Sequence, residues 1–312
     1  DPELDLVYWG VGNAGPWAPQ GRPGDNLYTA SVLAIKPKTG QIVWHRQLVP
    51  NEMFDLDAVW EWILADINVK GVKRKVTMHF SRGGFLYVID RTNGELLSAE
   101  PFEKVNWASH VDMKTGRPVE TEVSARVRAG EQIELWPGQW GGKNWAHAAF
   151  NPETGLLYAN TMHASRLVQF EPVEYKVGQR YVGLKNLPAP RDANTPIAHV
   201  DAVEPLTGKQ KWRTPIMDIP HYSAVLATAG GLLFTGKETG EFIALDMDTG
   251  KPVWQFQTSS GINAQPITFT RNGKQYVAIQ SGLGGVNVVR MGDALKNVPR
   301  GGSVWVFALM DQ

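Results

Sequence analysis

A short repeat constrains the fold of this chain more than any other feature. The pattern A-x-x-x-x-T-G-x-x-x-W occurs three times, at residues 34–44, 202–212 and 244–254, and looser copies cover residues 88–97, 110–119 and 150–159. Successive turn glycines stand at positions 40, 94, 155, 208 and 250, so they are 54, 61, 53 and 42 residues apart. A period of this length indicates a repeat architecture.

Each copy predicts a β-hairpin. An apolar strand ends, a Thr-Gly or Asn-Gly pair makes a turn that needs a positive φ, and an apolar strand that carries Trp follows. The repeat length matches a four-stranded blade of a β-propeller, in which the Trp is buried between neighbouring blades. A Greek-key sandwich with coincidental Thr-Gly turns is the alternative, and three nearly identical copies make it less favoured.

Short β-branched or aromatic segments bounded by turns support an all-β fold. They cover residues 83–91, 230–237, 240–246, 274–281 and 302–309. Five full blades would nearly use up the chain, and an incomplete ring would leave open edges. The longest stretches without the repeat, residues 51–70 and 176–198, are predicted to be loops or short helices, where function tends to lie.

Composition and charge narrow the possible functions. The 43% hydrophobic content excludes disorder, and no segment predicts a membrane span. Lys and Arg total 31, as do Asp and Glu, which argues against a nucleic-acid partner. The absence of cysteine excludes disulfides, zinc–thiolate sites and CxxCH haem attachment within these residues. The start DPELDLVYWG is unlike a signal peptide, so we expect a mature product or a fragment.

Three segments carry candidate site residues. Asn13 lies in the glycine-rich turn YWGVGNAGPW, where a plain turn asparagine is the alternative. Asp55 and Asp57 are two residues apart in NEMFDLD, so on an extended chain they point to the same side and need a cation between them, unless the loop is simply solvated. Residues 140–145, WGGKNW, offer amide, amine and indole donors that suit a flat anionic ligand, or else a packed blade interface.

The order of several long segments identifies a family resemblance. These are YWGVGNAGPW, RPGDNLYTASVLAIKPKTG, NEMFDLD, SRGGFLYVIDRTNGELL, GGKNW and residues 221–262. Together they resemble the PQQ-dependent (quinoprotein) alcohol dehydrogenases of the methanol/ethanol family. FEKVNWASHVDMKTGRPVE, LATAGGLLFTG and GGSVWVFAL resemble the ethanol-type branch. The resemblance implies an eight-bladed propeller, of which residues 1–312 look like the C-terminal half of the PQQ-binding domain, roughly half of the ring. The other half would supply further PQQ contacts, a glutamate metal ligand and a vicinal disulfide.

The resemblance implies roles for individual residues. Asn13 matches an asparagine metal ligand, and Asp55 matches both a metal ligand and the general base toward the alcohol. Arg82 matches a basic catalytic residue that contacts the quinone oxygens. Asn144 and Trp145 match residues that line the PQQ pocket. Tyr222, which follows His221, stands where close relatives have Trp, and we expect it to bind the cofactor as well.

Asp57 bears on the identity of the metal. Calcium-dependent members carry a small neutral residue at this position, whereas lanthanide-dependent members carry Asp. A trivalent cation favours one more anionic oxygen ligand. The resemblance therefore predicts a lanthanide ion at Asn13, Asp55 and Asp57, with Ca²⁺ as the alternative.

The implied function is oxidation of primary alcohols to aldehydes with PQQ and the metal, and transfer of electrons to a cytochrome c. A periplasmic location and a possible homodimer belong to the same set of expectations. The other hypothesis is a non-catalytic scaffold, such as the outer-membrane assembly lipoproteins that share the repeat. Asn13, Asp55, Asp57, Arg82 and Asn144 favour the enzyme, because a scaffold has no need of that set.

Overall fold

The computed structural model describes residues 1–216, 219–285 and 291–310. The chain forms two compact units. The first contains residues 1–144, 162–192 and 205–209, and the second contains residues 145–161, 193–204 and 210–312. Within the described residues, no helix is long and apolar enough to cross a bilayer.

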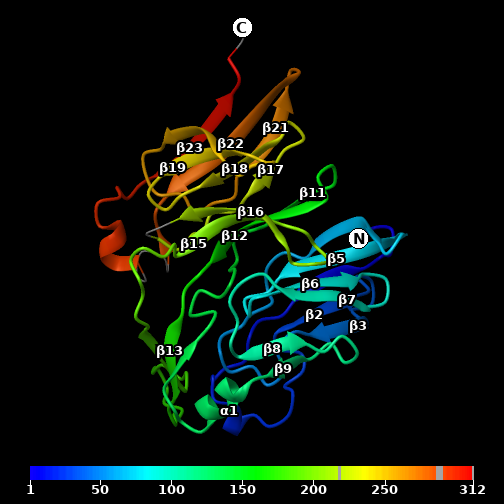
Figure 1. Ribbon diagram of the computed structural model, residues 1–312, viewed down its shortest axis with the longest axis vertical. Helices are drawn as coiled ribbons and strands as arrows, with labels where there is room; N and C mark the ends of the chain where they lie inside the picture. The colour runs from blue at the N-terminus through cyan, green and yellow to red at the C-terminus, as the bar shows by residue number, and fades with distance from the viewer. Residues whose placement is uncertain (217–218, 286–290, 311–312) are drawn as a thin grey trace. The chain divides into compact units, whose positions relative to one another are not determined.

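The first unit holds four antiparallel sheets among its described residues (Figure 1). One is formed by β1 (Val7–Gly10), β2 (Ser31–Ile35) and β3 (Ile42–Gln47). The second is formed by β4 (Ile63–Val69), β5 (Val72–Phe80), β6 (Phe85–Asp90) and β7 (Leu96–Pro101). A hairpin joins β8 (Ala108–Val111) to β9 (Pro118–Glu120), and β13 (Arg166–Phe170) pairs with β10 (Ile133–Leu135) and β14 (Leu184–Pro188). The helical segments are η1 (Pro19–Gly21) and α1 (Glu122–Arg128).

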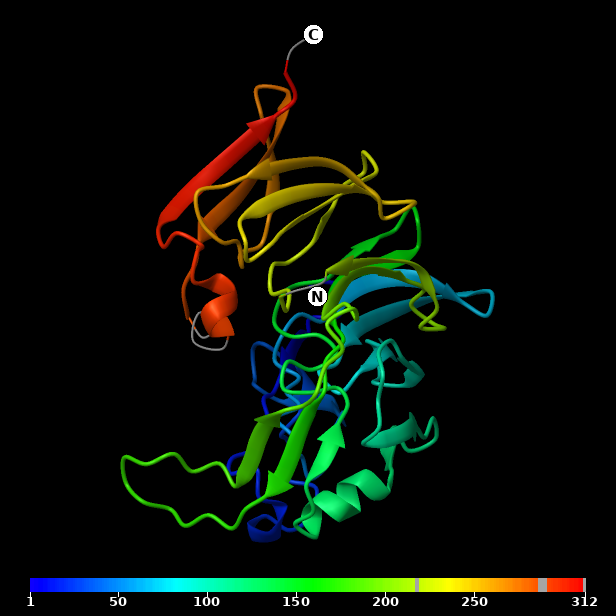
Figure 2. The same ribbon diagram turned by 60° about the vertical axis from the view of Figure 1, so that its left-hand side comes forward.

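The second unit holds three antiparallel sheets among its described residues. The first orders β11 (Ala149–Asn151), β12 (Leu156–Met162), β15 (Ala198–Val203) and β16 (Gln210–Ile216). The second orders β17 (Leu226–Ala227), β18 (Leu232–Gly236), β19 (Glu241–Asp246) and β20 (Pro252–Gln257), and the third orders β21 (Ile267–Arg271), β22 (Lys274–Gly282) and β23 (Gly302–Ala308). Figure 2 shows these last two sheets in yellow and in orange to red, and Phe242 of β19 packs with Ile279 of β22 between them. The short η2 (Gly292–Leu295) precedes β23.

All six copies of the repeat are β-hairpins, as predicted. In the three full copies the repeat's Ala faces its Trp across the hairpin: Ala34 faces Trp44, Ala202 faces Trp212 and Ala244 faces Trp254. The register shifts by one residue directly after each Ala. A bulge of this kind increases the local twist of the hairpin.

The repeat's Trp binds the next repeat's turn. The indole Nε1 of Trp44 donates to the carbonyl of Arg91 at 3.3 Å, and a Cβ on Gly94 would lie 2.9 Å from the Trp44 ring. In the second unit, Trp212 Nε1 donates to Met247 O at 2.9 Å, and a Cβ on Gly250 would lie 2.4 Å from its ring. The turn glycine is therefore needed twice, for its positive φ and for the space that the Trp occupies.

Two expectations about the non-repeat segments were wrong. Residues 51–70 contain β4, and residues 176–198 contain β14. The β4 sequence ILADINV alternates between more and less exposed positions and pairs with β5 throughout, so strand pairing decides its structure without the repeat's turn. The four-stranded blade is found in three sheets, whereas the other described sheets have two or three strands.

Candidate functional site

The guanidinium of Arg82 is the centre of a buried polar cluster in the first unit. Arg82 lies in the turn between β5 and β6 and is 5% exposed. Its Nη1 donates to Asp57 Oδ2 at 2.6 Å, and its Nη2 donates to Asp55 Oδ2 at 2.8 Å and to the carbonyl of Gln139 at 2.6 Å. The Arg82 guanidinium thus contacts both carboxylates of the 51–57 loop and the backbone of the loop that contains Gln139.

The loop of residues 51–57 presents both aspartates from one side. Met53, Phe54 and Leu56 are buried in the core of the first unit, which turns the intervening Asp55 and the following Asp57 toward Arg82. Asp55 has a φ of 65°, a left-handed conformation that is uncommon for a residue with a side chain. The expectation of an extended stretch is wrong here, because the left-handed backbone at Asp55 bends the loop; both carboxylates still reach the Arg82 guanidinium.

Asn13 joins the cluster from the segment after β1. Its backbone N–H donates to Asp57 Oδ1 at 3.0 Å. Oriented to satisfy its neighbours, its amide donates from Nδ2 to Asp57 Oδ1 at 2.8 Å and accepts from Trp17 Nε1 at 2.6 Å. Rotation of the amide by half a turn would bring its oxygen to face the carboxylate, an arrangement that needs a cation to be favourable.

The glycines of the WGGKNW loop allow it to wrap around Arg82. Gly142 N–H donates to the Arg82 carbonyl at 2.9 Å. Gly141 has a φ of +77°, and a Cβ there would lie 2.2 Å from Arg82 Cγ. The buried Asn144 lies at the end of the same loop, and its Nδ2 donates to Trp140 O at 2.9 Å.

Lys143 departs from the prediction that its amine would serve a bound anion. Its side chain is fully buried, and its Nζ lies 2.8 Å from Glu61 Oε1 and 3.0 Å from the Asn144 carbonyl. Burial lowers the pKa of Lys143, and the neighbouring Glu61 opposes this shift. The amine therefore anchors the loop internally, because a buried ammonium needs an adjacent anion.

Trp145 and Tyr222 belong to the second unit. Their ring centroids are 5.6 Å apart at an interplanar angle of 31°, with Trp145 42% exposed and Tyr222 1% exposed. The backbone N–H of Tyr222 donates to the buried Glu238, whose other oxygen lies 3.4 Å from His221 Nδ1. His221 is thus held inside this unit and is fully buried.

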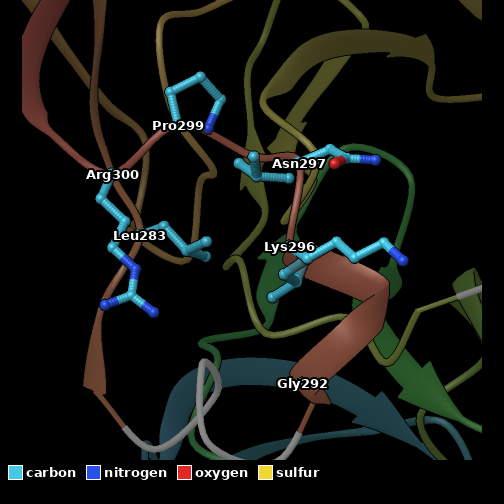
Figure 3. Close-up of a pocket in the computed structure, with 8 residues that line it drawn as sticks. Leu283, Gly292, Lys296, Asn297, Pro299 and Arg300 are labelled. Atoms are coloured by element: carbon cyan, nitrogen blue, oxygen red, sulfur yellow. The ribbon is translucent and has the colours of Figure 1, made fainter.

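A surface pocket of about 530 Å³ in the second unit contains none of the predicted site residues. Leu283, Gly292 and the segment 295–300 line it. The charged ends of Lys296 and Arg300 point away from each other (Figure 3), so they do not converge on one anion.

Comparison with known proteins identifies the family. Residues 1–106 and 215–277 match the PQQ family described as "Glucose/ethanol/alcohol dehydrogenase, beta-propeller domain". The chain is 41% identical, over 96% of its length, to a quinohemoprotein alcohol dehydrogenase, ADH IIB, of Pseudomonas putida and covers 44% of that protein. The chain belongs to the PQQ-dependent quinoprotein alcohol dehydrogenases.

Two further similarities concern members of the family named for a lanthanide. The chain is 40% identical, over 91% of its length, to a lanthanide-dependent methanol dehydrogenase of Methylorubrum extorquens, of which it covers 49%. A solved structure of a europium-containing methanol dehydrogenase aligns with a TM-score of 0.90 at 36% identity, over 99% of this chain and 58% of that one. The predicted all-β propeller class is confirmed. The chain spans about half the length of the curated relatives it matches.

The family implies a metal and PQQ, and the Arg82 cluster fits the metal in part. Two carboxylates, of which Asp55 is buried and Asp57 is partly exposed, face the single guanidinium of Arg82. Two carboxylates and the Asn13 amide are the hard oxygen donors that lanthanide and calcium ions prefer. No group of three or more His, Cys, Asp or Glu side chains suited to a metal is found in the described part of the chain.

Sequence reasoning missed residues that support this cluster. Trp17 Nε1 reaches the Asn13 amide, and the Gln139 carbonyl accepts from Arg82. Glu52 is 1% exposed and accepts from backbone N–H groups of its own loop. Burial raises the pKa of Glu52 to about 7, against the lowering effect of these N–H groups. Trp17 and Glu52 lie within the segments YWGVGNAGPW and NEMFDLD, but nothing in a loop glutamate or tryptophan alone indicates such a role.

Proposed function

We propose that the complete protein oxidises primary alcohols to aldehydes with PQQ and a lanthanide ion, and passes the electrons to a cytochrome c. The observation that carries the proposal is the contact of Arg82 with both Asp55 and Asp57, beside Asn13. The names of the relatives support the reaction class, since they include ethanol, alcohol and methanol dehydrogenases.

Asp55 acts as the base toward the alcohol in this proposal. A carboxylate fixed in orientation can accept the hydroxyl proton as the C–H bond breaks. Arg82 Nη2, at 2.8 Å, limits the orientations that the carboxylate can adopt, and low exposure keeps bulk water from competing for the base. When bound, PQQ accepts the hydride of the alcohol carbon, and the metal increases the electrophilicity of its quinone.

Asn13, Asp55 and Asp57 would hold the metal from this chain. Arg82 would bind the quinone oxygens and stabilise the negative charge that develops there. Asn144 would bind PQQ from the WGGKNW loop, and Trp145 and Tyr222 remain predicted cofactor contacts from the family resemblance.

The choice of a lanthanide rests on Asp57. Its carboxylate adds an anionic oxygen beside Asp55 and Asn13, and a trivalent ion gains more from this charge than a divalent one. The names of two similar proteins, a lanthanide-dependent and a europium-containing methanol dehydrogenase, support the choice. Ca²⁺ is the alternative.

We also propose a periplasmic location, a separate cytochrome c as electron acceptor and a possible homodimer. Alcohol oxidation delivers two electrons together, whereas a haem accepts one at a time, so two reduction events follow each turnover. The scaffold alternative is disfavoured, because the ion pair of Asp55 and Arg82 is costly to bury and serves no packing need.

The test is reconstitution of the complete protein with PQQ and either La³⁺ or Ca²⁺, followed by a dye-linked assay with a series of primary alcohols. We expect aldehyde formation that depends on PQQ and is faster with La³⁺. Absence of oxidation with either ion would contradict the proposed function. Equal rates with both ions would return the metal assignment to calcium.

A further inference from the structure

The loop that presents Asp55 contains a third acid that the proposed reaction does not use. The side chain of Glu52 folds back over its own loop, and Oε1 accepts the N–H of Phe54 and the N–H of Leu56, the latter at 2.9 Å. These two N–H groups belong to the residues on either side of Asp55. One carboxylate oxygen therefore binds one N–H group from the chain before Asp55 and one from the peptide group directly after it.

Asp55 needs this support because of its backbone conformation. Its φ of 65° lies in the left-handed region, where a side chain other than that of glycine is disfavoured. Such a conformation persists only where the surrounding structure holds it in place. The Leu56 N–H belongs to the peptide group that directly follows Asp55, so its bond to Glu52 restrains ψ of Asp55, while the bond from the Phe54 N–H holds the peptide group that precedes Phe54.

Other contacts also anchor the loop. The side chain of Asn51 donates to the carbonyls of Arg22 and Gly24, each at 2.9 Å, and these bonds hold the start of the loop. Arg166 donates to the carbonyl of Phe54 and so holds the peptide group directly before Asp55. Glu52 adds the bond to the peptide group directly after Asp55 and joins it to the chain before Phe54.

We propose that Glu52 is the positioning residue of Asp55: it holds Asp55 in the left-handed conformation and thereby directs its carboxylate toward Arg82 and the metal. Its consequence for catalysis rests on the proposed function above. The cost of keeping this acid buried supports the proposal. Its Oε2 has no hydrogen-bond partner among the described residues, and an apolar side chain would fill the same space without that penalty.

The experiment compares three substitutions of Glu52 in the complete protein. Glu52→Gln keeps an oxygen at the end of a side chain of the same length, so it can still accept both N–H groups. Glu52→Ala removes the acceptor, and Glu52→Asp keeps the charge but shortens the side chain. Glu103→Ala is the matched control, because Glu103 is a similarly buried acid of the same unit that accepts from Lys104 N and pairs with His163.

Three measurements separate positioning from general stability: Tb³⁺ affinity by tryptophan-sensitised luminescence, kcat and KM for a primary alcohol, and the melting temperature. We expect Glu52→Ala and Glu52→Asp to lower kcat and weaken Tb³⁺ binding by about tenfold to a hundredfold, with KM changed less than about threefold. Glu52→Gln should restore both quantities to within about threefold of the unmodified protein. Glu103→Ala should lower the melting temperature without changing Tb³⁺ affinity.

Equal effects of Glu52→Gln and Glu52→Asp on Tb³⁺ affinity would overturn the proposal, as would a loss of melting temperature with unchanged kcat and affinity. If Glu52→Ala does not fold, the comparison of Gln with Asp decides alone. Failure of the proposed function has a different signature. The unmodified protein would then oxidise no alcohol, while Tb³⁺ affinity would still rank the Glu52 variants.

Discussion

The repeat turns and the loop of residues 51–57 meet the same backbone requirement with different residues. In the 246–250 turn the left-handed position is Gly250, with a φ of 69°, whereas in the 51–57 loop the left-handed positions are Asn51, with a φ of 49°, and Asp55, with a φ of 65°. Glycine adopts this conformation at no steric cost, and aspartate does not. The repeat thus has glycine at its left-handed position, where no side chain is strained. The candidate site has aspartate there, which supplies a carboxylate at the cost of backbone strain.

The acids in the two regions also differ. Asp246 accepts the N–H and hydroxyl of Thr249 at 2.9 and 2.7 Å, and these bonds lower its pKa. Burial raises the pKa of Glu52 to about 7. Hydrogen-bond donors near solvent stabilise the charged form of the turn acid. Glu52 is buried, and burial disfavours its charged form. The two acids therefore differ in environment, as the opposite shifts of their pKa values show.

The largest effect that separates the two regions is expected for Asp55→Asn. The amide keeps the size of the side chain but cannot take a proton from the alcohol, so kcat should fall by about a hundredfold to ten-thousandfold. Steady-state assays of the complete protein measure this, and the absorbance of bound PQQ shows whether the cofactor is retained. Asp246→Asn, in a repeat turn, is the control and should leave kcat unchanged. Retained kcat in Asp55→Asn would remove Asp55 as the base.

The next effect concerns the metal. Asp57→Ala removes one anionic oxygen beside Asn13 and Arg82, so activity with La³⁺ should fall by about tenfold to a hundredfold, more than activity with Ca²⁺. The ratio of kcat/KM with the two ions is the measured quantity. An unchanged ratio would show that Asp57 serves its contacts with Arg82 and Asn13 and does not influence the choice of metal.

A smaller effect is expected on stability in the repeat turns. Gly94→Ala imposes a strained φ and brings a methyl group to 2.9 Å from the Trp44 ring, which should lower the free energy of unfolding by about 2–3 kcal/mol. Gly155→Ala is the matched control, because Gly155 also has a positive φ but faces open space, and it should cost about 1 kcal/mol. Denaturant titration measures both. Equal losses would show that the Trp44 contact contributes nothing.

The smallest effect is expected for Asp246→Asn. The pKa of Asp246 is lowered in the folded protein, so its carboxylate stabilises the fold above its ordinary value of 3.8, and the contribution is lost as the pH falls below that value. Asp246→Asn should therefore lower the melting temperature slightly at pH 7 and not at all once Asp246 is protonated. A difference from the unmodified protein that does not shrink in acid would contradict this account of the turn.

Sequence reasoning succeeded where one local requirement decides the structure. A turn at a Thr-Gly or Asn-Gly pair depends only on neighbouring residues. All six hairpins were therefore predictable. β4 was missed because its structure depends on pairing with β5, which has no turn signal of its own in the repeat. The spacing of Asp55 and Asp57 was equally compatible with a solvated loop, and their roles were predicted from the family resemblance. The internal contact of Lys143 depends on Glu61, a residue far away in the sequence.

The contact between the repeat's Trp and the following turn gives the array a direction. Trp44 reaches forward to the turn at Gly94, and Trp212 reaches forward to the turn at Gly250. Each of these two hairpins thus stabilises its successor in the chain, and this coupling acts between nearest neighbours. During synthesis, the indole of Trp44 or Trp212 can form its contact only after the following turn has been made. These contacts therefore form in the order in which the turns are synthesised.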